Sequence, residues 1–81
     1  MNTYKYITID DKKSLIIERI LNNERALYHL QVALFESNSN SSSQDEIDSI
    51  NIAINRCSSD MQTLNNIFSD LNNGIDQFNE Y

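Results

Sequence analysis

The sequence predicts an all-α protein, an antiparallel two-helix hairpin with a coiled-coil-like seam and a short extended N-terminal arm. Apolar residues recur in alternating steps of three and four along two long segments, as they do along one face of a helix. A polar stretch separates the two segments, and the 81-residue chain contains no proline and only one glycine, Gly74. Because proline and glycine are the usual residues that interrupt helices, this composition favours long continuous helices.

Residues 1–8 are expected to form the arm. The segment from Thr3 to Ile9 alternates loosely and is rich in Tyr, Ile and Thr, which fits a short extended segment or, equally, a frayed end. Thr8 stands three residues before Asp11, which resembles the spacing of an N-terminal capping box. The first helix is therefore expected to begin near Ile9.

A first helix is predicted over residues 9–36. Its seam positions are Ile16, Ile20, Asn23, Leu27, Leu30 and Leu34. Asn23 is the one plainly polar member, and it either fixes the register when buried or lies solvated where the helices are wider apart. A second apolar row lies about 100° around the helix from this seam. It consists of Ile17, Leu21, Tyr28 and Phe35, and it predicts contact with another chain, because one antiparallel neighbour covers only one row.

A polar loop is predicted over residues 37–43, which can neither pack nor continue an apolar pattern. Ser43 stands three residues before Glu46, the spacing of a capping box, so a second helix is predicted over residues 44–73. Its seam positions are Ile47, Ile50, Ile54, Cys57, Met61, Leu64, Phe68 and Leu71. The row of Asn51, Ser58, Asn65, Asn72 and Asn79 lies beside this seam, as either a hydrogen-bonding ladder or a neutral polar boundary.

A C-terminal extension is predicted over residues 74–81. Gly74 costs about 1 kcal/mol in a helix interior relative to alanine, so the second helix is expected to bend or end there. The apolar pattern nevertheless continues through Ile75 and Phe78. Either a last helical piece resumes after the glycine, or the tail folds over the end of the hairpin.

Two helices of nearly equal length joined by a short polar connection form an antiparallel hairpin. Folding about the loop centre pairs positions whose numbers sum to about 80, which places Asn23 near Cys57 and Ile16 near Leu64. The same folding predicts that side chains from both chain ends close the open end of the hairpin, namely Tyr4, Tyr6, Ile7, Ile75 and Phe78.

The small size of the chain predicts association. A domain of this length buries only about 60% of the surface that its unfolded chain exposes, and a single cysteine rules out an internal disulfide. We therefore expect a homo-oligomer or a complex with a heterologous protein partner.

The net charge of −6 belongs to the second half of the chain. Residues 5–36 carry five basic and five acidic side chains, whereas residues 37–81 carry one basic and seven acidic side chains. This charge argues against nucleic acid and anionic membranes as partners. The sequence also lacks an apolar run near the roughly 18 residues of a membrane span, and it lacks the pattern of a secretion signal. A cytoplasmic protein is expected.

No residue pattern predicts catalysis, a metal site or a cofactor. Cys57 and His29 are the only cysteine and histidine, and His29 lies on a different face from the seam, so Cys57 is expected in the core and His29 at the surface. The sequence has neither paired carboxylates in apolar surroundings nor a glycine-rich phosphate loop. We therefore expect a protein that is not an enzyme.

The start of the first helix resembles the small helical-hairpin accessory proteins of tailed bacteriophages. The resemblance covers the first 36 residues and rests on Tyr4-Lys5-Tyr6-Ile7-Thr8-Ile9-Asp10, on Lys12-Lys13 and on Leu15-Ile16-Ile17-Glu18-Arg19. It implies no catalytic residue. It implies a viral accessory or virion protein, located in the host cytoplasm or in the virion.

Two classes of function fit these observations. The first is a structural or assembly protein that uses its second apolar row to associate into a helical bundle or to dock on a larger assembly such as a phage virion. An adaptor that accepts a partner helix would use the same surface. The second is an acidic regulator or inhibitor that occupies a basic cleft of a host protein. Against the second, the acids of residues 44–78 are spread over several helix faces, which dilutes their local field.

Overall fold

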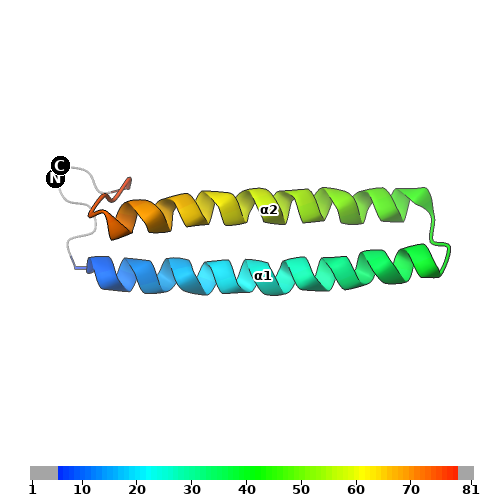
Figure 1. Ribbon diagram of the computed structural model, residues 1–81, viewed down its shortest axis with the longest axis horizontal. Coiled ribbons are helices and arrows are strands. Elements are labelled where there is room, and N and C mark those ends of the chain that lie inside the picture. The colour runs from blue at the N-terminus through cyan, green and yellow to red at the C-terminus, as the bar shows by residue number, and fades with distance from the viewer. Residues whose placement is uncertain (1–5, 79–81) are drawn as a thin grey trace.

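The computed structural model describes residues 6–78, which contain two long helices packed against each other (Figure 1). The first helix, α1, spans Ile9–Ser39, and the second helix, α2, spans Gln44–Asn72. They run in opposite directions, so the molecule is an elongated rod with extents of 55 × 19 × 17 Å. The described residues contain no strand, and the predicted all-α hairpin is confirmed.

Both helices begin with a side-chain cap at the predicted positions. The Thr8 hydroxyl oxygen accepts a hydrogen bond of 3.1 Å from the backbone N–H of Asp11. The Ser43 hydroxyl oxygen accepts one of 3.3 Å from the backbone N–H of Glu46. Each cap satisfies one of the N–H groups that a first helical turn leaves without an intrahelical partner. Acidic residues in both first turns interact favourably with the positive end of the helix dipole.

The first helix continues beyond the predicted end at Glu36 and stops at Ser39. Serine and asparagine disfavour a helix by only about 0.5 kcal/mol each relative to alanine, so a polar segment can add most of a helical turn at low cost. The backbone N–H of Ser42 then donates to the carbonyl oxygen of Ser37 at 2.9 Å. Ser41 lies between them at a φ of 56°, in the left-handed region. The loop is therefore limited to residues 40–43.

Gly74 ends the second helix. The Gly74 N–H donates to the carbonyl oxygen of Leu71 at 3.0 Å, and the Ile75 N–H donates to that of Asp70 at 2.8 Å. This pair of bonds is the Schellman motif, which requires a left-handed residue at the glycine position. Gly74 has the required φ of 76°. The helix does not resume, and residues 75–78 turn back from its end (Figure 1).

The seam residues lie between the two helices. Four of them are buried, namely Ile16, Cys57, Leu64 and Leu71. The others are half-buried, namely Ile20, Asn23, Leu27, Leu30, Leu34, Ile47, Ile50, Ile54, Met61 and Phe68. The buried cluster lies toward the open end, where Ile20, Ile67 and Phe68 pack against it. No side chain among residues 6–78 is less than 2% exposed, so the hairpin has a thin core.

One contact across the hairpin confirms the predicted pairing. The thiol of Cys57 donates to the backbone carbonyl oxygen of Asn23 at 3.1 Å. The contact uses the Asn23 main chain, while the residue as a whole is half-buried. Cys57 is a buried free thiol, which agrees with its predicted place in the core.

The two left-handed positions give a paired test of the turns. We expect Gly74→Ala to lower the free energy of unfolding by about 1 kcal/mol, because alanine disfavours positive φ. A Cβ atom at this position meets no atom within 4 Å, so the loss reports backbone conformation alone. Ser41→Gly should raise the free energy of unfolding by up to about 1 kcal/mol for the converse reason. Urea unfolding followed by circular dichroism measures both, and two unchanged midpoints would contradict these turn geometries.

Candidate protein interaction surface

The second apolar row of the first helix is exposed in the hairpin. Tyr28 is 71% exposed and Phe35 is 73% exposed, while Ile17 and Leu21 keep more than two fifths of their surface in contact with solvent. Val32 is exposed as well, and it lies four residues after Tyr28 and three residues before Phe35. We call these five residues the α1 stripe. Sequence reasoning missed Val32, although the same helical spacing would have included it.

The second helix has no comparable row. Its one exposed large hydrophobic residue is Ile52, which lies on the side of α2 away from the seam. The polar row beside the α2 seam is exposed, and its described members are Asn51, Ser58, Asn65 and Asn72. Asn79, the fifth member predicted for this row, lies outside the described residues. Of the two helices, α1 therefore has the greater apolar exposure. Outside the stripe, other large hydrophobic side chains are also exposed in residues 6–15 and 75–78, namely Tyr6, Ile7, Ile9, Leu15, Ile75 and Phe78.

The stripe and the polar row lie on the same face of the hairpin. Two antiparallel helices are related by an approximate two-fold axis perpendicular to the plane that contains them. Residues that directly precede a seam residue therefore lie on one face of the hairpin in both helices, and residues that directly follow a seam residue lie on the other face. Arg19 and Ile67, which each directly precede a seam residue, line the same hollow. The residues that directly follow the seam therefore share the opposite face. On this face α1 carries four exposed apolar side chains, whereas the α2 positions are polar and, apart from Asp48, uncharged.

The hollow lies on the other face, at the open end of the hairpin. It has a volume of about 230 Å³ and is lined by Ile7, Lys12, Leu15, Ile16, Arg19, Ile67, Leu71, Asp76 and Phe78. Ligand pockets typically measure about 300 to 1,000 Å³, so this hollow is small for a ligand site. Ile7 and Phe78 both line this hollow, but Ile7, Ile75 and Phe78 remain about half exposed and Tyr6 is 87% exposed, so these side chains do not close the open end. Tyr4 lies outside the described residues.

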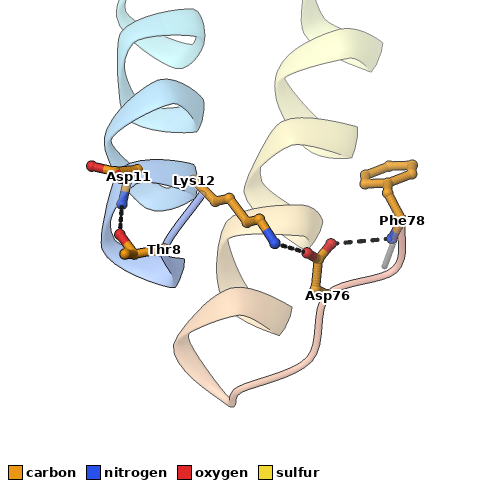
Figure 2. Close-up of polar contacts among 5 residues, drawn as sticks. All are labelled: Thr8, Asp11, Lys12, Asp76 and Phe78. Atoms are coloured by element: carbon orange, nitrogen blue, oxygen red, sulfur yellow. Dashed lines mark hydrogen bonds and ion pairs between the residues drawn. The ribbon is translucent and has the colours of Figure 1, made fainter. Parts of the chain in front are cut away.

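An ion pair holds the tail against the first helix at this end (Figure 2). The ammonium group of Lys12 contacts a carboxylate oxygen of Asp76 at 2.5 Å, and the two side chains are only 15% and 8% exposed. The other carboxylate oxygen accepts a hydrogen bond of 3.1 Å from the backbone N–H of Phe78. The hydrogen bond from Lys12 lowers the pKa of Asp76 below its ordinary value of 3.8. Burial of the carboxylate raises this pKa, whereas the hydrogen bond from the Phe78 N–H lowers it further.

Sequence reasoning did not predict this ion pair. The carboxylate reaches Lys12 only because the chain reverses after Gly74, and the direction of such a tail is not encoded in helical periodicity. The nearest sequence signal is the opposite charge of the two residues, which many other pairs in the chain share.

The other chemistry-bearing residues are dispersed. His29 is exposed on α1, and Cys57 is buried in the seam. Within residues 6–78, no three His, Cys, Asp or Glu side chains are grouped in a way that would hold a metal ion. Over the same range, no helix combines the length and apolarity needed to cross a membrane. The exposed α1 stripe is therefore the main candidate surface.

Comparison of the chain with profiles of known families, with curated proteins and with solved structures finds no significant match. The assignment of a role to the α1 stripe therefore rests on the geometry described above.

The Lys12 and Asp76 pair predicts a specific acid sensitivity. Folding lowers the pKa of Asp76, so the ionised carboxylate stabilises the folded state. This stabilisation is complete above pH 3.8 and is lost as the pH falls through the lowered pKa. We expect Asp76→Asn to reduce the free energy of unfolding at neutral pH by up to about 1 kcal/mol. The difference from the wild type should vanish in strong acid. Urea unfolding across this pH range measures it.

Asp60→Asn is the control for this prediction, because it removes an equal charge from an exposed position on α2. Surface substitutions of this kind usually change stability by less than about 0.5 kcal/mol. A deficit in Asp76→Asn that persists unchanged in strong acid would show that the ionised carboxylate is not its source.

Proposed function

We propose that this protein is a structural or assembly protein that works without catalysis, through helix-to-helix contact with other protein chains at the α1 stripe. The observation that carries the proposal is the exposure of five large apolar side chains in one row, on a helix whose seam is already occupied by α2. Exposed apolar rows that are continuous along an element are typical of protein contact sites.

The energetics favour a partner. Burying one large apolar side chain stabilises a contact by roughly 1.5 to 3 kcal/mol before the costs of association are subtracted. Tyr28 and Phe35 have most of that surface still exposed in the hairpin. Because the hairpin itself has a thin core, a second contact would also add to the stability of the fold.

The proposed partners are further copies of this chain in a helical bundle, or a larger assembly on which the hairpin docks. The resemblance of the first 36 residues to phage accessory proteins suggests a virion as one such assembly. An adaptor that accepts a partner helix would use the same stripe.

An acidic regulator is the weaker proposal. Several carboxylates of the second half are already engaged within the chain. Asp76 binds Lys12, Asp70 accepts a hydrogen bond of 2.6 Å from Gln77, and Asp48 accepts one of 2.8 Å from Gln44. These contacts, and the spread of the acids over several faces, reduce the field available to a basic cleft.

The proposal predicts association that depends on the stripe. Analytical ultracentrifugation from micromolar to millimolar concentration should show a mass that rises with concentration. Tyr28→Ser combined with Phe35→Ser should weaken this association by more than about tenfold. Burial of two large apolar side chains contributes more than the roughly 1.4 kcal/mol that corresponds to a tenfold change in affinity. Helicity should change little, since both side chains are exposed in the single hairpin.

Ile52→Ser is the matched control. It removes a large apolar side chain that is 54% exposed, but on α2 and away from the stripe. Association should be unaffected by it. A strict monomer across the whole concentration range, with full helicity and no partner, would count against the proposed function.

A further inference from the structure

We infer that the α1 stripe binds a second copy of this chain, with the two α1 helices packed antiparallel about a two-fold axis near Ala26 and each α2 on the outside. This inference rests on the proposed function and specifies its partner and geometry. It follows from three features of the described residues, which are the distribution of apolar surface, the distribution of charge and the self-complementarity of the stripe.

Apolar surface favours contact between two α1 helices. An apolar row is best buried against another apolar row, and Ile52 is the single exposed large hydrophobic residue of α2. The α2 positions on the stripe face are polar and, apart from Asp48, uncharged, and burying them without hydrogen bonds would cost free energy. Among the helices of this protein, the α1 stripe of a second copy is therefore the better match.

Charge favours the same arrangement. Within their bounds, α1 carries four basic and five acidic side chains, whereas α2 carries one basic and five acidic side chains. Two nearly neutral α1 helices can lie in contact with little repulsion, but two acidic α2 helices repel each other within a screening length of roughly 8 Å. Packing through α1 keeps the acidic helices apart.

The stripe is complementary to itself when reversed. Its outer members are Ile17 and Phe35, so a two-fold axis midway between them passes near Ala26. This axis places the aliphatic end of one stripe against the aromatic end of the other, with Ile17 facing Phe35 of the partner subunit and Leu21 facing Val32 of the partner subunit.

The polar groups near the axis match as well. The same axis places Glu24 beside Tyr28 of the partner subunit, where the tyrosine hydroxyl can donate to the carboxylate. Symmetry creates this pair twice. Glu24 and Tyr28 are both exposed in the single hairpin, so neither has to leave a buried position to form the pair.

The available area is sufficient for a modest dimer. The stripe side chains are between 40% and 73% exposed, and a whole aromatic side chain has roughly 150 to 250 Å² of surface. Each copy therefore offers at most about 500 Å², and a dimer can bury at most about 1,000 Å², which is near the lower limit for a specific interface. We expect an affinity in the micromolar range rather than the nanomolar range.

Cross-linking between two different single-cysteine chains tests this geometry. Cys57 is first replaced by Ser in all chains, because a serine hydroxyl can still donate to the Asn23 carbonyl. One chain then carries Ile17→Cys, and a second, isotopically labelled chain carries Phe35→Cys. The chains are treated with a short bifunctional thiol reagent, separately and after mixing, and the products are identified by mass spectrometry.

The expected result is a mixed dimer that forms at least about tenfold faster than the dimer of either chain alone, because only unlike ends lie together in the antiparallel pair. Equal self-linking of the separate chains would indicate parallel α1 helices and would overturn the inference. Association without any cross-link would do so too, by placing the contact elsewhere. The parallel result leaves the proposed function standing, because the α1 stripe is still the contact, whereas association elsewhere overturns the role of the stripe as well. A wild-type protein that stays monomeric overturns this inference and leaves docking on a heterologous assembly as the remaining form of the proposed function.

Leu21→Cys and Val32→Cys form a second pair of chains for the same experiment, in case the outer positions disturb folding. Both replace side chains that are less exposed than Phe35, and they face each other closer to the axis. Circular dichroism of each chain checks that the helices are intact before the reagent is added.

Discussion

The seam between α1 and α2 is the interaction on which the rest of the structure depends. A single helix of this composition would be marginal in water, because helical stability in proteins comes mostly from packing an apolar face. The seam supplies that packing along nearly the full length of both helices. It also fixes their relative register, as the contact between Cys57 and the Asn23 carbonyl shows. Once the register is set, the face on which each other helical side chain lies follows from its position relative to the seam.

A two-helix seam has a physical limit. Each helix has one neighbour, so a side chain in the seam is covered from one direction and stays partly open at its flanks. This explains why most seam residues are half-buried and why the buried cluster gathers at the open end, where residues beyond α2 add a further cover. The ion pair between Lys12 and Asp76 fastens that cover to α1. At the loop end, no comparable segment is present within residues 6–78.

The sequence predicted the features that arise from periodicity and from local hydrogen bonding. Both caps, the pairing of Asn23 with Cys57 and the all-α hairpin follow from spacing rules that act over a few residues or over a regular repeat. The first helix extends beyond its predicted end because the propensities of Ser and Asn oppose a helix only weakly. The tail direction and the ion pair could not be predicted, since they depend on one backbone torsion at Gly74 and on what it then brings into reach.

The candidate surface was predictable in outline for the same reason. Ile17, Leu21, Tyr28 and Phe35 each follow a seam residue by one position, so their direction is fixed as soon as the seam is known. The sequence could not show that the corresponding positions of α2, which are polar and mostly uncharged, lie at the surface of the same face, because that requires the relative placement of both helices.

The two helices thus differ in surface character, although both contribute residues along the seam. The α1 helix carries nearly balanced charge and a second apolar row, whereas α2 carries most of the net negative charge and a single exposed large hydrophobic residue. Negative charge on α2 disfavours contact between two α2 helices through electrostatic repulsion, whereas the nearly balanced charge of α1 leaves its apolar stripe open to the proposed partner. The exposed apolar stripe and the excess of negative charge thus lie on different helices, and the proposed contact through α1 makes use of this asymmetry.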